Sequence, residues 1–366
     1  MQNLQLREKD YYPQLNALRG IGVLSVFLFH SYKPKFGSGF LMKFAAFCYN
    51  NIYLSMDMFF ALSAFIITHL AFKEMQLKGS FSFKNFIIRR VLRIWPVYFI
   101  ILFLSFVVIK GIADHYNIPV ALPPASWYIF FISNFYLEDH VFFLRQLWTI
   151  SVEEQFYIIW GTCLLLFNKE LKWIIFSIAI IGVVFCFCSA YLKRGVYFHS
   201  LNYVFDMMCG AYFAYLINNR SFIIKKIGTG SFVQSLIIYL FLPFFFLSYY
   251  FLNSQLSPVS QNFLDIIMRI IFILHHCVIF IDQMYNENSL FNLSKAKFLI
   301  YVGEIAYGVY CFHGLVLTTG FLLISRLNFQ IAPFLAAVIM FAITLIIGTI
   351  SYKYIEKPIL RLKRRF

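Results

Sequence analysis

Residues 332–354, APFLAAVIMFAITLIIGTISYKY, contain no charged side chain before Lys353. Roughly 20 apolar residues in a helix, at about 1.5 Å rise each, cross the hydrocarbon core of a bilayer. The whole chain has this character: of its 366 residues 61% are hydrophobic and 13% are charged, and the mean hydropathy is +0.74. An ordinary globular domain has roughly 45–50% apolar and about 25% charged residues. The composition therefore excludes a soluble fold and predicts an integral membrane protein.

Ten stretches of the sequence are apolar and long enough to be membrane spans. They lie near 15–31, 51–72, 86–109, 146–167, 172–192, 201–218, 231–252, 263–284, 298–324 and 332–354. Long continuous apolar runs favour helices, whereas a membrane β-barrel has alternating strands of about ten residues. We therefore expect an all-α, polytopic membrane helical bundle with about ten transmembrane helices. The spans and their loops use residues 1–366, so we expect a single membrane domain without an appended soluble domain.

The distribution of Lys and Arg predicts how these spans are oriented. Of the 31 Lys and Arg residues, 22 fall on the side that holds both ends of the chain, 8 fall on the other side, and Arg269 lies inside a span. Because cytoplasmic loops carry the excess of Lys and Arg, we expect cytoplasmic N and C termini. The net charge of +15 is explained by this topology and by contact with anionic lipids, and we expect no nucleic-acid partner.

Three further features limit the alternatives. The first 14 residues contain no small-residue cleavage site, so we expect the first span to remain in the protein. The seven Cys residues show no zinc-type spacing, so we expect free thiols and no metal site. The loop near 110–145 is the one that is long enough for structure of its own.

Ionisable side chains inside a span cost roughly 2.5–3.5 kcal/mol each on insertion scales, so each is a candidate functional residue. Arg19 and His30 are eleven residues apart in the first span, close to three helical turns, and therefore face the same way. Arg90 and Arg93, near the start of the third span, present two guanidinium groups on one helix face, which suits phosphate groups. The alternative for this arginine pair is an anchor that reaches lipid headgroups.

Acidic side chains and further histidines complete the set of interior ionisable groups. Asp57 in the second span needs a cationic or hydrogen-bonding partner, and His30 on the neighbouring span is available. Glu153 and Glu154 lie about 100° apart on the fourth span, so they cannot serve the same partner. The remaining candidates are Asp206, His275, His276, Glu304, His313 and Glu356. For the adjacent pair of histidines we favour interhelical hydrogen bonds.

Six short motifs follow one another along nearly the whole chain. They are LRG at 18–20 with His30 after ten intervening residues, MDMFFALSAF at 56–65, RVLRIWPVY at 90–98, LWTISVEEQFY at 147–157, AYGVYCFH at 306–313 and IEKP at 355–358. In this order they resemble the integral-membrane acyltransferase-3 family of mostly bacterial O-acyltransferases. The sequence departs from the family pattern at four places, namely Ala64, Ala306, Gly308 and Gly314-Leu315.

The resemblance implies transfer of an acyl group, usually acetyl from acetyl-CoA, to a hydroxyl of a cell-envelope glycan or its lipid-linked precursor in the bacterial inner (cytoplasmic) membrane. Arg90, Arg93 and Arg19 lie on the expected cytoplasmic side and are the predicted acyl-CoA-binding residues. His30 lies deeper and is the predicted general base, because an imidazole titrating near neutral pH can take a hydroxyl proton.

Further side chains are expected to assist His30. Asp57 or Glu154 would orient its ring and stabilise the imidazolium, as the third member of a triad does. The predicted supporting residues are Glu153, His313 and Glu356.

Three alternatives remain open from the sequence. A covalent acyl-histidine relay competes with general-base catalysis. Succinyl-CoA or a longer acyl-CoA competes with acetyl-CoA as donor. A transporter or lipid flippase with an arginine-lined path is the competing class of protein, because intramembrane Arg, His and acidic residues also suit a substrate pathway. Consumption of acetyl-CoA with release of free CoA thiol separates the enzyme from the transporter.

Overall fold

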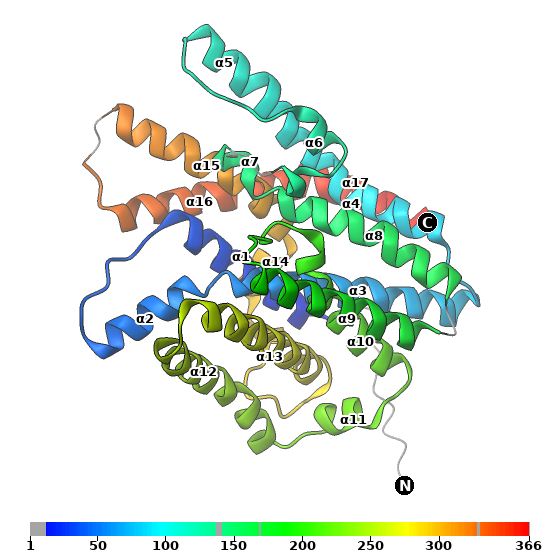
Figure 1. Ribbon diagram of the computed structural model, residues 1–366. Coiled ribbons are helices and arrows are strands. Elements are labelled where there is room, and N and C mark those ends of the chain that lie inside the picture. Colours follow the sequence, from blue (N-terminus) through cyan, green and yellow to red (C-terminus); the bar gives the residue numbers. More distant parts are fainter. Residues whose placement is uncertain (1–11, 137–140, 168–169, 328–329, 366) are drawn as a thin grey trace.

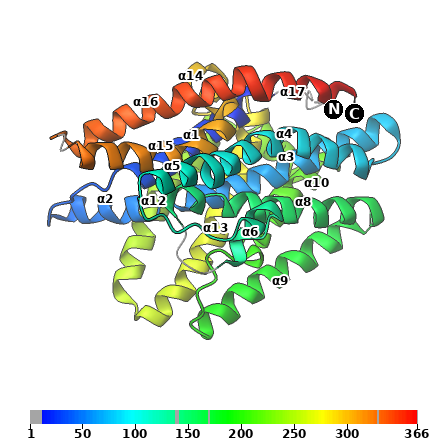
Figure 2. The ribbon, with the colours of Figure 1, turned by 90° about the horizontal axis from the view of Figure 1, so that it is seen from above.

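The computed structural model describes residues 12–136, 141–167, 170–327 and 330–365, and the regular elements in these ranges are all helices. Most of the long helices run along one common direction, as Figures 1 and 2 show from two sides. Seven of the described helical stretches are long and apolar enough to cross a membrane. The chain is therefore an all-α, multi-pass membrane protein, as its sequence predicts.

The helices follow one another along the chain with short connections. The first half contains α1 (Pro13–Ser31), α2 (Phe40–Asn50), α3 (Leu54–Lys78), α4 (Phe83–Phe103), α5 (Lys110–His115), α6 (Ala125–Ile129), α7 (Phe142–Arg145) and α8 (Trp148–Leu166). The second half contains α9 (Leu171–Tyr191), α10 (Val204–Asn218), α11 (Phe222–Gly228), α12 (Phe232–Gln255), α13 (Pro258–Tyr285), α14 (Lys297–Glu304), α15 (Ala306–Arg326), α16 (Pro333–Ser351) and α17 (Lys357–Arg361). Short 3₁₀ or π segments are η1 (Leu104–Ile109), η2 (Ser133–Phe135), η3 (Ser200–Asn202), η4 (Leu293–Lys295), η5 (Tyr352–Glu356) and η6 (Leu362–Arg365).

A helix lies at each of the ten predicted ranges, although the number of crossings and the side of the termini stay predictions. The predicted span 298–324 is two helices, because the backbone leaves the helical path at Ile305, where φ is −91° and ψ is 3°. The predicted span 86–109 continues as a helical stretch to His115 through a π-helical segment. Helix α2 was not predicted, because its 11 residues are too short for a span.

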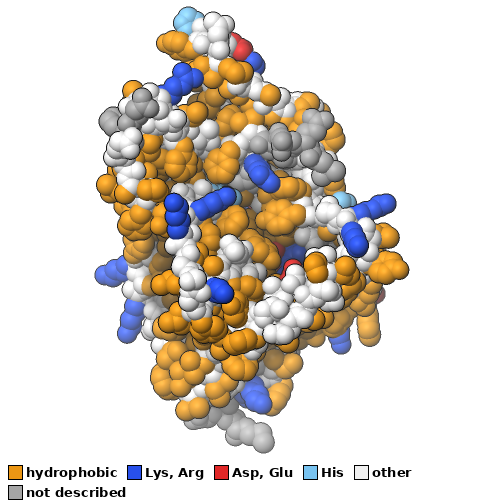
Figure 3. All heavy atoms as spheres, turned by 60° about the vertical axis from the view of Figure 1, so that its left-hand side comes forward, with side chains coloured by type: hydrophobic (Ala, Val, Ile, Leu, Met, Phe, Trp, Pro, Cys, Tyr) orange, Lys and Arg blue, Asp and Glu red, His pale blue; other side chains and the backbone are white. Residues whose placement is uncertain are grey.

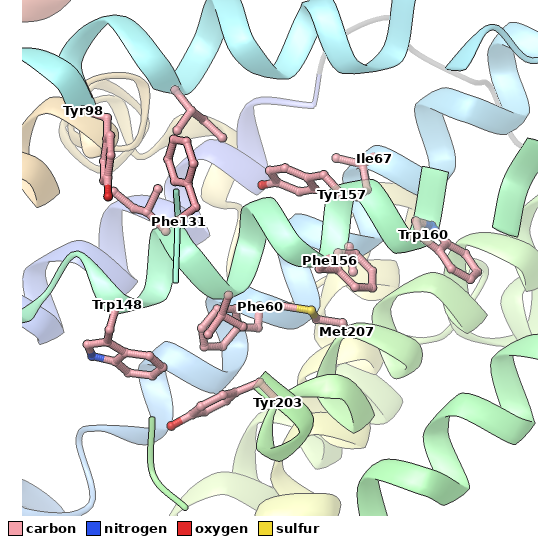
Figure 4. Close-up of a cluster of buried hydrophobic side chains, with 14 of the residues drawn as sticks. Phe60, Ile67, Tyr98, Phe131, Trp148, Phe156, Tyr157, Trp160, Tyr203 and Met207 are labelled. Carbon is pink, nitrogen blue, oxygen red and sulfur yellow. The ribbon is translucent and has the colours of Figure 1, made fainter. Parts of the chain in front are cut away.

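Helix α3 lies at the centre of the bundle, and α12 lies at its edge. In the most apolar window of each helix, 61% of the α3 residues are buried, against 17% for α12. One large cluster of buried side chains joins α3, α4, α8, α10 and α15, and Figure 4 shows part of it around Phe60, Trp148 and Trp160. A second cluster joins α3 and α10 to α13. The central helices thus form the frame that holds the polar side chains described below.

The outer surface of the bundle is apolar. On α12, Phe232, Ile237 and Phe244 are between 54% and 68% exposed. Figure 3 shows one face on which hydrophobic side chains predominate, with Lys and Arg scattered among them. Such a surface suits contact with lipid chains, and helix association then depends on close packing through small residues.

Two close helix crossings depend on glycine. A Cβ atom on Gly20 of α1 would collide with the carbonyl of Leu299, and one on Gly303 of α14 would collide with the carbonyl of Asn16. Because the two helices approach this closely, Arg19 is held beside the break between α14 and α15. Gly210 of α10 permits an equally close approach to α3.

Candidate functional site

A cavity of about 120 Å³ lies among α1, α3, α4, α8 and the junction of α14 with α15. This arginine cavity is lined by polar side chains and by a larger apolar set. The polar ones are Arg19, Ser63, Arg90, Arg93, Thr149, Glu153, Tyr157, Tyr307 and Tyr310. One water molecule needs roughly 10–15 Å³ of such space, so the cavity has room for a group several times larger. The three arginines predicted from the sequence therefore meet in one place.

The three guanidinium groups of this cavity have no carboxylate partner within ion-pair distance among the described residues. Arg19 donates a hydrogen bond of 3.3 Å to the side-chain amide oxygen of Asn16. Arg90 stacks on Phe86 and Tyr157, with its guanidinium carbon 5.8 and 5.7 Å from the ring centroids, and its buried Nε has no partner. Uncompensated positive charge in a low-dielectric surrounding is costly, so the cavity favours an anionic occupant.

Glu153 and Glu154 point to different places, as their adjacency on α8 predicts. Glu153 lines the arginine cavity. Glu154 accepts a hydrogen bond of 3.2 Å from the indole nitrogen of Trp95, and its other carboxylate oxygen is buried without a partner. The carboxylate that faces the three arginines is thus Glu153, which was expected to be a supporting residue. The structure gives Glu154 this contact with Trp95 and no hydrogen bond to His30, so its role in orienting that ring stays a prediction.

A hydroxyl network leads from the arginine cavity toward the other end of α15. Thr149 and Tyr310 both line the cavity, and their side-chain oxygens are 2.7 Å apart. The Tyr310 hydroxyl also donates to the backbone carbonyl of Gln146 at 2.7 Å. His313 follows Tyr310 by three residues on α15. Its imidazole therefore lies on the same side of the helix as the Tyr310 ring, about one turn further along.

His30 and His313 form a directly hydrogen-bonded histidine pair. Nδ1 of His30 lies 3.1 Å from Nε2 of His313, and the two rings are stacked with centroids 5.2 Å apart. Phe142 of α7 meets the His30 ring edge-on at 5.7 Å. The structure therefore brings together two residues that lie 283 positions apart in the sequence.

The hydrogen bonds assign the tautomers of this pair. Nδ1 of His313 lies 2.5 Å from the backbone carbonyl of Tyr310, and a carbonyl oxygen can only accept. His313 Nδ1 therefore carries the hydrogen, and its Nε2 accepts a hydrogen bond from His30 Nδ1. The lone pair of neutral His30 then lies on Nε2, which has no described hydrogen-bond partner. This is the arrangement that a base or a nucleophile requires.

Asp57 lies in a different polar group, and its predicted contact with His30 is wrong. The Asp57 carboxylate forms an ion pair of 3.1 Å with Arg269 of α13, and Arg269 also pairs with Asp206 of α10. The guanidinium carbon of Arg269 lies 4.6 Å from the ring centroid of Tyr203, which Figure 4 shows beside Trp148 and Phe60. We call Asp57, Asp206 and Arg269 the ion cluster. Arg269 is thus paired with both carboxylates of the cluster, Asp57 and Asp206, and neither carboxylate pairs with His30 or His313.

The last two helical turns of the chain lie near the arginine cavity. The buried Glu356 accepts a hydrogen bond of 3.1 Å from Ser351, and it packs against Gly308 of α15. Lys363, in the 3₁₀ segment that packs on α4, lies within electrostatic reach of all three arginines. Burial and then these arginines lower the pKa of Lys363 to about 6. The supporting role of Glu356 stays a prediction, and Lys363 is a further titratable group near the cavity.

Several residues of the site did not emerge from the sequence. Thr149 and Tyr310 lie within two of the six motifs, but their ordinary hydroxyls did not single them out as site residues. Arg269 did have a signal, because a lone arginine inside a span needs a partner. Among the described residues no three His, Cys, Asp or Glu side chains gather where they could hold a metal ion.

Fold and site together define a multi-pass helical membrane protein with a cationic cavity and a histidine pair. The sequence profile described as "Acyltransferase domain" matches residues 12–353. The chain therefore belongs to the acyltransferase-3 family.

Curated relatives match almost the whole of this chain. A provisionally named O-acetyltransferase of Staphylococcus aureus strain COL is 26% identical over 380 residues, which are 96% of this chain and 58% of the relative. The peptidoglycan O-acetyltransferase OatA of Listeria monocytogenes is 25% identical over 381 residues, which are 96% of this chain and 56% of the relative. The chain thus spans somewhat more than half the length of the relatives it matches. No solved structure matches the chain significantly.

Proposed function

We propose that this protein is a membrane O-acetyltransferase of the bacterial cytoplasmic membrane. It takes an acetyl group from acetyl-CoA at the arginine cavity and delivers it to a hydroxyl of a cell-envelope glycan or its lipid-linked precursor. The observation that carries the proposal is the meeting of three unpaired arginines in one cavity that is linked through Tyr310 to the histidine pair. The names of the relatives support acetyl as the acyl group and a glycan as the acceptor.

The arginine cavity suits the phosphate groups of an acyl-CoA. A planar guanidinium group binds phosphate with two parallel hydrogen bonds, and Arg90 and Arg93 present two such groups from one face of α4. Arg19 faces them from α1. These contacts recognise the CoA portion, so a succinyl or longer acyl chain would satisfy them equally, and the acyl specificity is set elsewhere.

His30 Nε2 acts as the general base in this proposal. It takes the proton from the acceptor hydroxyl while that oxygen attacks the thioester carbonyl. The carbon–sulfur bond then breaks, and the proton passes from the imidazolium to the departing thiolate, which leaves as CoA thiol. Such a base contributes typically about 10²–10⁴-fold in rate. In the competing relay, Nε2 itself attacks the thioester and carries the acetyl group to the acceptor.

The test is release of CoA thiol from acetyl-CoA by the full chain in nanodiscs, with a crude extract of cell-envelope glycans as acceptor. Wild type, His30→Ala and His275→Gln are compared, because His275 is a half-buried histidine on α13 whose Nε2 hydrogen-bonds the backbone carbonyl of Ile238 on α12, away from the site. We expect wild type to release CoA thiol only when the extract is present. His30→Ala should release none, and His275→Gln should release as much as wild type.

The other outcomes contradict parts of the proposal. Equal release by His30→Ala means that the base is wrongly assigned. If wild type releases no thiol from acetyl-CoA or succinyl-CoA, acyl transfer fails and a transporter remains. Mass spectrometry of the extract identifies the acetylated acceptor.

A further inference from the structure

A second cationic site lies at the other end of the histidine pair from the arginine cavity. Arg19 is the seventh residue of α1 and His30 is the eighteenth, so about 16 Å of helix separates them. Beyond His30 stands α7, which packs against α15, as Figure 1 shows. Its first residue, Phe142, touches the His30 ring, and its last residue is Arg145. Arg145 is near enough to act electrostatically on His30.

The Arg145 side chain is exposed and stacks on an aromatic ring. Its guanidinium carbon lies 5.6 Å from the centroid of Phe198, and it forms no ion pair with any described residue. Phe198 in turn packs on Trp148 at 5.3 Å and on Tyr197 at 5.1 Å, and Tyr197 is 45% exposed. Stacking leaves the edge of the guanidinium group, with its N–H donors, free to bind a planar anion.

We infer that Arg145, Phe198 and Tyr197 form the acceptor subsite, and that the acceptor is an anionic glycan with a carboxylate or phosphate near the reacting hydroxyl. This inference rests on the proposed function. The anion would bind the edge of Arg145, and a sugar ring would lie on the exposed face of Tyr197. The hydroxyl to be acetylated would then point toward His30 Nε2. Donor and acceptor would thus approach the histidine pair from opposite ends, the donor at the three arginines of the arginine cavity and the acceptor at Arg145.

Binding without catalysis tests this subsite. The probe is the fluorescently labelled disaccharide GlcNAc–MurNAc, whose lactyl group carries a free carboxylate, and its methyl ester is the matched neutral probe. Each is titrated against the full chain carrying His30→Ala in nanodiscs, alone and combined with Arg145→Gln, Arg145→Lys or Arg194→Gln. Arg194 is an exposed arginine of the loop after α9 and serves as the control.

We expect the acid to bind at least about tenfold more tightly than the ester, and Arg145→Gln to abolish that difference, because a charge-assisted hydrogen bond is lost. Arg145→Lys should restore part of it, and Arg194→Gln should leave it unchanged. Equal binding of acid and ester, or an equal loss for both with Arg145→Gln, would overturn the inference.

Two further arms separate the sources of an effect. If Arg145→Gln changes the affinity for the acid in nanodiscs that contain phosphatidylglycerol but not in phosphatidylcholine alone, Arg145 binds a lipid headgroup. The inference is then overturned. Release of CoA thiol by the protein with His30 intact is measured in parallel. If no CoA thiol is released, the proposed function is contradicted even when the acid binds. If the acid does not bind selectively, only the proposed acceptor subsite is contradicted.

Discussion

The arginine cavity and the ion cluster use the same residue type inside one bundle in opposite ways. In the ion cluster, a single guanidinium group has two carboxylate partners, Asp57 and Asp206. In the arginine cavity, three guanidinium groups share one lining carboxylate, Glu153, which lies beyond ion-pair distance from all three. In the ion cluster the protein itself therefore supplies the counter-charge of the guanidinium group, and we interpret the cluster as structural. The arginine cavity has an excess of positive charge that an anionic ligand would neutralise.

This difference shows how to separate structural from functional charge in a membrane protein. Every ionisable group inside a span is expensive, so its presence alone identifies a candidate and nothing more. The deciding observation is whether the protein supplies the counter-charge. Asp57 was a reasonable candidate by position, and its pairing with Arg269 removes it from the catalytic set.

The largest expected effect comes from breaking the ion cluster. Arg269→Leu leaves Asp57 and Asp206 buried without a cation, and breaking one side of a buried ion pair costs about 3–5 kcal/mol. We expect a marked loss of thermal stability, measured by unfolding in detergent, with unchanged CoA affinity for the protein that remains folded. A variant as stable as wild type would show that the cluster is not structural.

For the arginine cavity we expect the opposite result, a loss of acetyl-CoA binding without a loss of stability. Arg90→Gln and Arg93→Gln should each weaken acetyl-CoA binding about tenfold, since each removes a charge-assisted contact to phosphate. Stability should not fall, because neither side chain has a carboxylate partner among the described residues. The measurements are KM for acetyl-CoA and the unfolding temperature. A loss of stability like that of Arg269→Leu would erase the distinction between the two regions.

A smaller effect is expected at His313, which positions His30 and does not touch substrate in this account. His313→Gln keeps a side-chain acceptor for His30 Nδ1, whereas His313→Phe removes it. We expect the phenylalanine variant to lower kcat about tenfold with little change in KM. The loss is smaller than the full contribution of a general base, because His30 itself is still present. The glutamine variant should recover much of that loss. Identical losses for both would indicate a packing role.

The smallest effect is expected at Lys363, and it depends on pH. With a pKa of about 6, Lys363 is mostly neutral near pH 8 and becomes charged as the pH falls. A charged lysine beside the cavity attracts phosphate, so KM for acetyl-CoA should fall from about pH 8 to about pH 6 more steeply in wild type than in Lys363→Met. The donor phosphates titrate alike in both assays, so the difference isolates Lys363. Parallel pH profiles would contradict this assignment.

The sequence predicted the features that depend on local spacing. The ten apolar ranges all coincide with helices, because a long continuous apolar run in a membrane satisfies its backbone hydrogen bonds as a helix. Arg90 and Arg93 share one cavity because they lie three residues apart on one helix. Glu153 and Glu154 diverge because adjacent positions on a helix point in different directions.

The partners of the key side chains were not predictable from the sequence, because they come from distant helices. The predicted partners of His30 were Asp57 and Glu154, whereas the fold pairs it with His313 of α15. The break at Ile305 has no proline that would predict it, and the nearby close contact of Gly303 with the carbonyl of Asn16 joins residues from distant parts of the chain. Both outcomes are consequences of helix packing, which single-sequence patterns do not specify.

The most direct test of the central claim is CoA binding to the full chain in nanodiscs, measured by calorimetry for wild type, Arg90→Gln/Arg93→Gln and Arg89→Gln. Arg89 neighbours Arg90 on α4 but pairs with Glu74 outside the cavity, so it is the matched control. The account predicts that the double variant loses about a hundredfold in affinity, from two charge-assisted contacts, while Arg89→Gln binds like wild type. Equal affinity of all three proteins for CoA would contradict the claim that the unpaired arginines are the donor site.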